Sequence, residues 1–425
     1  MTRVVCVHPD QLPDELLPGV DYFTVYRSSG SERVSTVGTG LLYDLDKNGL
    51  CPPATAWDFT TFSLAVSAAD QSVARSRSPD GWTRVMELSV ALADPAPFQA
   101  ISTTLEGMLR YLTGDFWTLD FVEGGEPAPR STAPVLYEAD CVSLLSGGVD
   151  SLVGGIDLAS GGARPLYVSQ MAKGDSETQM HYARQLGGSE RHFQWNQNIR
   201  VNHTTERSTR ARSIVFFAFA VLAAAELHAQ TGGTVPVYVP ENGFIGLNVP
   251  LNAGRTGSLS TKTTHPVFLT KLQEVLSSLS LPVSLVRPYA FKTKGELLAE
   301  CSNRGLLTRL VGRSTSCGRY GYYNYTHCGR CVPCQVRRAS FLASGIPDTT
   351  QAYYFPNLRV AGRKSGANDI GAVAAAVLRL ERDGPRSLTA GQLSFAAPSE
   401  RAGYERVVVR GLQELGSLLR NQGVL

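Results

Sequence analysis

The pattern of apolar and polar positions predicts strands that alternate with helices through the middle of the chain. Helical spacing fills the intervals between short apolar runs, and the longest helix is expected at Arg210–Gln230. This order favours an α/β fold in which a parallel sheet is wrapped by helices over residues 136–310. Such sheets bind ligands at the carboxyl ends of their strands. Five runs have the length and composition of buried strands: Val142–Leu145, Pro165–Ser169, His192–Trp195, Val235–Val239 and Val283–Val286.

The pattern changes on both sides of this region. Residues 1–122 combine strand-like runs with one helical stretch, Phe98–Leu112, and we expect a mixed α+β domain with a β-sheet and at least one helix. Residues 123–135 form a linker by composition, because Gly and Pro dominate their first half. Helical spacing at Ala372–Leu380 and Tyr404–Leu419 predicts that residues 346–425 form a helical tail, either a cap or a surface for a partner.

The most informative stretch joins the first strand of the 136–310 region to the helix after it. It reads Leu145-Ser146-Gly147-Gly148-Val149-Asp150-Ser151. Glycines let the backbone approach a ligand closely, and the unpaired N–H groups and dipole of a helix start favour an anion such as phosphate. The hydroxyls of Ser146 and Ser151 and the carboxylate of Asp150 add ligands for phosphate and for a divalent metal. The loop lacks the Gly-Lys-Ser/Thr ending of a Walker loop. An ordinary serine–glycine turn is the alternative.

Four residues farther along the chain are candidates for the same site. Arg212 opens the long apolar helix, where a buried arginine needs an anion; the alternative is an arginine that caps carbonyls or pairs with a carboxylate. Glu241 and Asn242 follow a strand directly and could read a polar heterocycle or hold magnesium, unless they form an ordinary turn. Lys294 could contact phosphate or lie on the surface. Residues 255–265 are rich in Gly, Ser, Thr and Lys, which predicts a lid over the site or a solvated loop.

Composition favours a globular enzyme over a nucleic-acid-binding or membrane protein. The 425 residues are 43% hydrophobic and 18% charged, which is typical of a globular enzyme with a sizeable core. A formal net charge of +3 is too small to indicate a nucleic-acid-binding protein. The first residues lack the apolar stretch of a signal peptide, and the most apolar segment, Ile214–Ala225, is shorter than a membrane span, so we expect a buried helix and no membrane partner. We expect a cytoplasmic protein.

Four of the eight cysteines lie close together near residue 330. The set is Cys317, Cys328, Cys331 and Cys334, with the spacing C-x10-C-x2-C-x2-C. Four thiolates at this spacing match a closed tetrahedral zinc site, and four protein ligands leave no position open for a substrate, so the zinc would be structural. An iron–sulfur cluster is the alternative, followed by a redox Cys-x-x-Cys pair. We therefore expect residues 311–345 to form a zinc-binding segment.

Ser146-Gly147-Gly148-Val149-Asp150-Ser151 resembles the signature loop of the N-type ATP pyrophosphatases. Together with one four-cysteine knuckle followed by Arg337-Arg338, it makes residues 140–345 similar to the 7-cyano-7-deazaguanine synthase (QueC-like) family, and within it to the QueC-like component of the Qat anti-phage defence systems. The resemblance implies a PP-loop fold of the adenine nucleotide alpha hydrolase type, with ATP and Mg²⁺ as ligands. Arg212 matches only the arginine of an Arg-Asn pair in that family.

The resemblance implies an ATP-dependent ligase that adenylates the carboxylate of a 7-carboxy-7-deazaguanine-like base and passes it to an amine. In this hypothesis the loop from Leu145 to Ser151 binds pyrophosphate, and Asp150 helps to bind Mg²⁺. Arg212 and Lys294 stabilise developing negative charge. The amine could be ammonia, which leads to an amide and then a nitrile, or could belong to a protein partner in a defence operon. The alternatives are a tRNA-modifying thiolase and a non-catalytic nucleotide-binding subunit of a defence complex.

Overall fold

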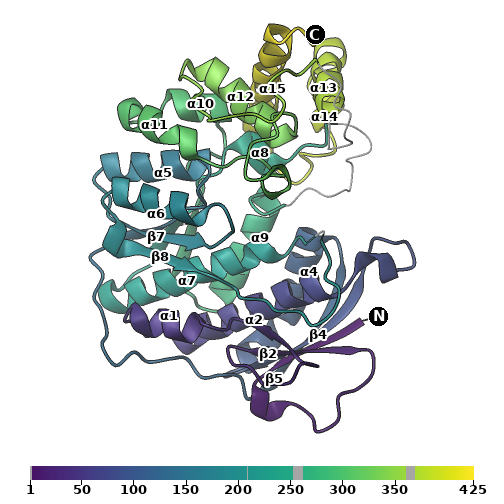
Figure 1. Ribbon diagram of the computed structural model, residues 1–425, viewed down its shortest axis with the longest axis vertical. Coiled ribbons are helices and arrows are strands. Elements are labelled where there is room, and N and C mark those ends of the chain that lie inside the picture. The colour runs from purple at the N-terminus through teal and green to yellow at the C-terminus, as the bar shows by residue number, and fades with distance from the viewer. Residues whose placement is uncertain (1, 208, 252–261, 360–368) are drawn as a thin grey trace.

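The chain folds around two parallel sheets of five strands each (Figure 1). The computed structural model describes residues 2–207, 209–251, 262–359 and 369–425. The first sheet has the order β3-β2-β1-β4-β5 and contains β1 (Thr2–Val7), β2 (Val20–Val25), β3 (Ser35–Val37), β4 (Val85–Leu92) and β5 (Phe116–Glu123). The second has the order β10-β9-β6-β7-β8 and contains β6 (Cys141–Leu144), β7 (Pro165–Gln170), β8 (His192–Trp195), β9 (Val235–Tyr238) and β10 (Val283–Val286).

Helices connect the strands and cover the sheets. The first region contains α1 (Leu41–Lys47), α2 (Ala54–Ser72), α3 (Ala96–Ala100) and α4 (Ser102–Thr113). The second contains α5 (Val149–Ser160), α6 (Ser176–Gln185), α7 (Arg212–Thr231), α8 (Gly243–Leu247), α9 (Pro266–Ser278), α10 (Lys294–Ala299) and α11 (Arg304–Leu310). The last contains α12 (Val332–Ser344), α13 (Ile370–Asp383), α14 (Arg386–Thr389) and α15 (Pro398–Asn421). Short 3-10 turns occupy Pro9–Gln11, Arg75–Arg77, Ser189–Arg191, Val311–Arg313 and Gly321–Tyr323.

These elements confirm the predicted α/β class, with a parallel sheet wrapped by helices and a helical C-terminal region. The five predicted strand runs coincide with β6 to β10. The N-terminal region departs from the expected mixed α+β domain, because every strand pair of its sheet is parallel. Parallel strands require crossover connections, and α1 and α2 lie in the one that leads from β3, at one edge, to β4 beside β1. Residues 255–261 of the predicted lid lie outside the described part of the chain.

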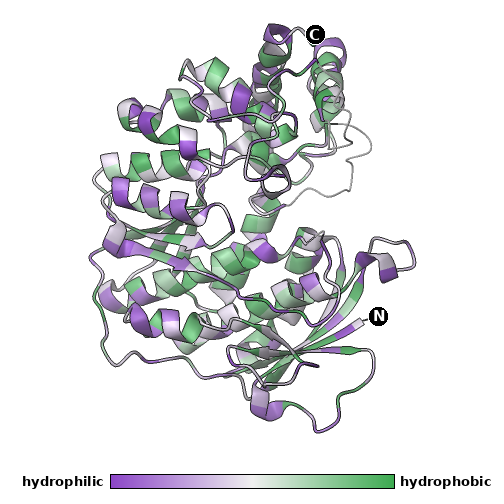
Figure 2. Ribbon diagram, in the orientation of Figure 1, coloured by the Kyte–Doolittle hydropathy of each residue, from purple (hydrophilic) through white to green (hydrophobic). Residues whose placement is uncertain are grey.

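The two sheets share one apolar core, with a double layer of helices between them (Figure 1). Helix α2 packs against α7, and α4 against α9, so each sheet presents its helices to those of the other. Helices α5 and α6 lie on the other side of the second sheet, near α10 and α11. Figure 2 shows that much of the N-terminal sheet and much of α7 are coloured as hydrophobic. The core therefore runs through both sheets.

Helix α7 is the central element of this core. Among the described helices it is the one long and apolar enough to cross a membrane, but 72% of its most apolar window is buried inside the protein. Sheet strands contact it on one side and α2 on the other. Such all-round burial is typical of the core helix of a large globular fold, as the length and flanking charges of residues 214–225 predicted.

The C-terminal helices form a separate apolar cluster that rests on α8 and α12. The last helix, α15, also reaches the start of α10, where Glu414 accepts hydrogen bonds from the Thr293 hydroxyl and from the main-chain N–H of Gly295 (3.3 Å). Thr293 and Glu296 form a capping box at the same helix start. The helical tail thus fixes the turn that carries Lys294.

Candidate nucleotide site and metal centre

The glycine loop lies between β6 and α5, at the carboxyl edge of the second sheet. Leu145 extends the strand pairing by donating its N–H to the Val168 carbonyl (2.8 Å). The chain then turns at Gly147, whose φ of +88° lies in the left-handed region that glycine adopts without strain. Gly148 is the N-cap of α5 and provides no side-chain cap. The first N–H groups of α5 are therefore left for another acceptor, as an anion site requires.

Two hydroxyls belong to the same turn. Ser146 Oγ accepts from the Gly148 N–H (3.3 Å) and lies 3.1 Å from Ser151 Oγ, which donates to the Gly148 carbonyl (3.1 Å). Gln179 donates its side-chain amide to the carbonyl of Ser146 (3.1 Å) and so holds the loop from α6. These hydrogen bonds fix the conformation of the loop without a ligand.

A cavity of ≈ 350 Å³ opens beside this loop, within the size range of small-molecule sites. One part of its wall is polar and the other apolar. The polar part contains Ser146, Gly148, Asp150, Ser151, Glu241, Thr263, Thr264, Lys294, Thr315 and Ser316. The apolar part contains Leu144, Val149, Phe216, Phe217, Val239, Pro240, Ile245 and Pro333. A ligand with a charged end and a flat apolar end fits such a wall.

Asp150 is the centre of a buried polar network at the cavity floor. It is 5% exposed, and its Oδ1 accepts from Lys294 Nζ at 2.6 Å. Its Oδ2 accepts from the main-chain and side-chain amides of Asn242, at 3.1 and 2.6 Å. The three groups come from α5, from the turn after β9 and from the first turn of α10. Each buried polar group has a partner, as its burial requires.

The pKa values of the two carboxyl groups, Asp150 and Glu241, are shifted in opposite directions. Burial opposes the ionisation of Asp150, but Lys294, with hydrogen bonds from its neighbours, holds the pKa of that carboxyl below its usual value. Burial and the adjacent Asp150 charge raise the pKa of Glu241 well above its usual value. The ionised form is thus favoured at Asp150 and the protonated form at Glu241. A divalent cation would favour the ionised form of both, and carboxylate and hydroxyl oxygens are the ligands that Mg²⁺ prefers.

The structure brings most of the sequence-predicted residues together. Ser146, Gly148, Val149, Asp150, Ser151, Glu241 and Lys294 line the cavity, and Asn242 lies directly beneath Asp150. Leu145 and Gly147 shape the loop without lining the cavity. Arg212 is exposed at the start of α7 and does not line it. The buried arginine of this helix start is Arg210, which donates to the Thr113 carbonyl (2.7 Å).

Sequence reasoning missed several parts of the wall. Phe216 and Phe217 lie in an uninterrupted apolar run, where no pattern separates a cavity-facing ring from a core ring. Thr315 and Ser316 lie just before Cys317 of the predicted zinc-binding set, and that proximity was the available signal. The cysteine segment therefore contributes to the cavity as well as to the metal centre.

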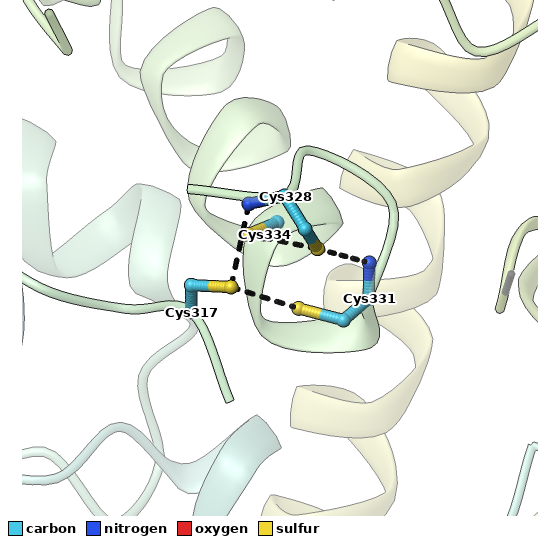
Figure 3. A group of neighbouring side chains, drawn as sticks. All are labelled: Cys317, Cys328, Cys331 and Cys334. Atoms are coloured by element: carbon cyan, nitrogen blue, oxygen red, sulfur yellow. Dashed lines mark hydrogen bonds between the residues drawn. The ribbon is translucent and has the colours of Figure 1, made fainter. Parts of the chain in front are cut away.

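The four predicted cysteines form one buried cluster (Figure 3). Their sulfurs all lie within 4.8 Å of one another, with Cys317 Sγ 4.0 Å from Cys331 Sγ and Cys328 Sγ 3.8 Å from Cys334 Sγ. Four sulfurs around a tetrahedral zinc at about 2.3 Å are about 3.8 Å apart. The cluster therefore fits Zn²⁺ with four protein ligands and no open coordination position.

Main-chain donors support these sulfurs. The N–H groups of Arg319 and Cys328 point to Cys317 Sγ (both 3.4 Å), and that of Cys331 points to Cys328 Sγ (3.2 Å). Gly329, with φ +84°, makes the turn between two ligands, and a Cβ there would lie 2.5 Å from the Phe355 carbonyl oxygen. N–H donors stabilise thiolate charge, which is the form that binds metal.

The cysteine cluster is connected to the glycine loop by one short segment. The N–H of Thr315 donates to the Gly147 carbonyl at 3.0 Å, two residues before Cys317 of the cluster. Arg337 of α12, fully buried, donates to the hydroxyls of Ser314 (2.7 Å) and Ser316 (3.3 Å) and to the Val311 carbonyl (3.0 Å). The position of the loop thus depends on the segment that the cysteines anchor.

Fold and site together define an α/β protein with a glycine-loop cavity and a four-cysteine centre. Comparison with protein-family models, with curated proteins and with solved structures finds no match to this chain. Its function therefore has to be argued from its own residues.

Proposed function

We propose that this protein is an ATP-dependent ligase that adenylates the carboxylate of a 7-deazaguanine-type base and transfers the acyl group to an amine. The observation that supports this most is the cavity itself, where the glycine loop, Asp150, Glu241 and Lys294 meet an apolar wall. The resemblance of the loop and the cysteine knuckle to the QueC-like family supplies the substrate class and points to bacterial anti-phage defence in the cytoplasm.

In this proposal the loop N–H groups and the hydroxyls of Ser146 and Ser151 bind the β- and γ-phosphates of ATP. A carboxylate oxygen of the base attacks the α-phosphorus, the bond to the bridging oxygen breaks, and pyrophosphate leaves. Asp150 and Glu241 would hold Mg²⁺, which when bound neutralises charge on the leaving group. Lys294 is already paired with Asp150, so its part is to keep that carboxylate ionised and in place.

The apolar wall of the cavity has a matching role. Phe216 and Phe217, with Ile245, offer flat apolar surface to the adenine or to the deazaguanine ring. An amine then displaces AMP from the acyl-adenylate and an amide forms. With ammonia, a second ATP-dependent dehydration gives a nitrile; with an amine of a protein partner, the product is a conjugate. Arg212 is exposed and does not line the cavity, but its charge acts on Asp175, which packs against Gly147 of the loop. In this proposal it stabilises negative charge that develops near the loop.

The thiolase alternative requires a reactive cysteine near the loop. Cys141 is the first residue of β6, at the opposite end of the strand from the loop, and burial raises its thiol pKa. Burial also raises the pKa of Cys301 to about 11. Neither residue lines the cavity, and a thiol with a raised pKa is a poor nucleophile. These observations favour the ligase over the thiolase.

The test is release of pyrophosphate from ATP and Mg²⁺, with and without 7-carboxy-7-deazaguanine. We expect release that depends on the base, and a loss of about a hundredfold in Ser146→Ala and Asp150→Asn, because each removes a group that contacts the leaving phosphates or their metal. Ser160→Ala, at the exposed end of the same helix, is the matched control and should keep full activity. Pyrophosphate release that needs tRNA would support the thiolase. Nucleotide binding without turnover would support a non-catalytic subunit.

A further inference from the structure

A second cavity, of ≈ 310 Å³, lies between α4, the start of α7, the start of α9 and the segment before α15. Its polar lining includes Tyr111, Arg210, Lys262, His265, Gln392 and Ser394. Among the described residues that line it there is no aspartate or glutamate. A cavity with cationic side chains and no acidic one has a positive potential that favours an anion.

Arg210 is the buried cation of this cavity. It is 7% exposed, and its guanidinium stacks over the Trp82 ring at 4.6 Å. Nη1 donates to the Thr113 carbonyl, but Nε and Nη2 have no hydrogen-bond partner. Unpartnered donors on a buried charge are costly. A negative ligand in the adjoining cavity would offset part of that cost.

The nearby carboxylates cannot supply this partner, because their oxygens are already in use. Asp70 accepts through Oδ2 from the main-chain N–H groups of Arg210 (2.5 Å) and Ala211 (2.7 Å), and through Oδ1 from Arg84. Both oxygens of Asp115 accept from the guanidinium of Arg75, at 2.8 and 3.0 Å. The side chain of Arg210 is thus left with positive charge and free donors.

Lys262 and His265 complete the set from the opposite wall. Lys262 is exposed at the mouth of the cavity, with its ammonium 4.3 Å from the centre of the Tyr111 ring. His265 Nδ1 accepts from the Val267 N–H (3.2 Å), so the Tyr111 hydroxyl, at 2.7 Å, donates to the same nitrogen. This places the ring hydrogen of neutral His265 on Nε2. Burial, with the charges of Lys262 and Arg287, lowers the pKa of His265 to about 4.

We propose that this second cavity is a binding site for a small phosphate-type oxyanion, held by Arg210, Lys262 and His265. A guanidinium, an ammonium and an imidazole N–H around one cavity suit a tetrahedral anion with several acceptor oxygens. The site is distinct from the nucleotide cavity but shares a wall with it. Thr263 and Thr264 line the nucleotide cavity, whereas their neighbours Lys262 and His265 line this one.

The test is calorimetric titration of the full-length protein with inorganic phosphate and with pyrophosphate, in buffer without nucleotide or magnesium. We expect Lys262→Met to weaken binding about tenfold, as the loss of one charged contact does. Lys271→Met, on α9 and outside the cavity, removes the same charge and should bind as the unmodified protein does. Both lysines lie at the surface or close to it, so both variants are expected to fold.

A third variant, Ser146→Ala, removes a hydroxyl that lines the nucleotide cavity and so separates this site from the glycine loop. The proposal requires that Ser146→Ala keeps phosphate binding that Lys262→Met loses. The opposite result would mean that the phosphate occupies the nucleotide cavity, and would overturn the proposal. Equal losses of phosphate affinity in Lys262→Met and Lys271→Met would mean that only the overall charge matters, and would overturn the proposal. Absence of binding at millimolar phosphate would overturn it as well.

Discussion

Two side chains, Ser169 and His192, support the glycine loop. Ser169 of β7 donates its hydroxyl hydrogen to the carbonyl of Leu145 (2.6 Å), the residue before Ser146. His192 Nε2 lies 2.8 Å from the same hydroxyl, so the ring has to be the donor and neutral His192 carries its hydrogen on Nε2. Burial lowers the pKa of His192 to about 4. A half-buried histidine thus supports the loop in its neutral form.

This pKa predicts how stability depends on pH. The unfolded chain binds a proton to His192 near pH 6.5 and the folded protein only near pH 4, so the contribution is fully present above 6.5 and is lost as pH falls toward 4. His192→Gln keeps a donor for Ser169 but does not titrate. We expect the thermal midpoint of the unmodified protein to fall more steeply than that of His192→Gln between these two pH values. An equal dependence of the thermal midpoint on pH in the two proteins would contradict the role given to His192.

At the scale of elements, residues 311–317 connect the cysteine cluster and helix α12 to the glycine-loop cavity. Cys331 is the N-cap of α12 and Cys334 lies in its first turn, while Arg337, one turn later, donates to Ser314 and Ser316. Thr315 then holds the Gly147 carbonyl. A change in the metal centre is therefore transmitted to the loop over a few residues.

Removal of zinc should affect both stability and nucleotide binding. Zinc binding to four thiolates contributes on the order of 10 kcal/mol to folding in small domains, so Cys331→Ser or a strong chelator should lower the thermal midpoint sharply. Nucleotide affinity, measured by calorimetry below the new midpoint, should fall as well. Cys51→Ser is the matched control, because this half-buried cysteine lies outside the cluster. Zinc loss with unchanged nucleotide affinity would disprove the link between centre and loop.

At the scale of the whole molecule, the two sheets are joined by a buried ionic network as well as by apolar packing. Asp70, at the end of α2, accepts from two main-chain N–H groups at the start of α7 and so caps a helix of the other region. Its second oxygen pairs with the fully buried Arg84. Breaking such a pair is costly because it leaves a buried charge without its partner. The N-terminal region is therefore an integral part of the structure that carries the cavity.

Asp70→Asn tests this coupling. It preserves shape but removes the charge that faces Arg84 and the N-terminus of α7, and we expect a loss of about 3–5 kcal/mol in the free energy of unfolding. A drop in thermal midpoint, with nucleotide binding lost at the same temperature as the N-terminal region unfolds, would support a single cooperative unit. Asp94→Asn, the same exchange at an exposed aspartate, is the control. Unfolding of residues 1–122 in a separate transition would contradict the single cooperative unit.

The sequence alone determines the features that are local in the chain. Apolar runs of strand length predicted β6 to β10, and the glycine loop and the C-x2-C-x2-C spacing lie within a few residues, so their geometry follows from neighbouring φ/ψ angles. Burial on all sides concealed α2, because 16 of its 19 residues lie inside and no amphipathic period marks it. Only the tertiary structure decided that Lys294 pairs with Asp150 across 144 positions, that Arg212 faces solvent, and that Asp70 caps α7. Pairings of this kind depend on how sheets and helices pack, and no local pattern encodes them.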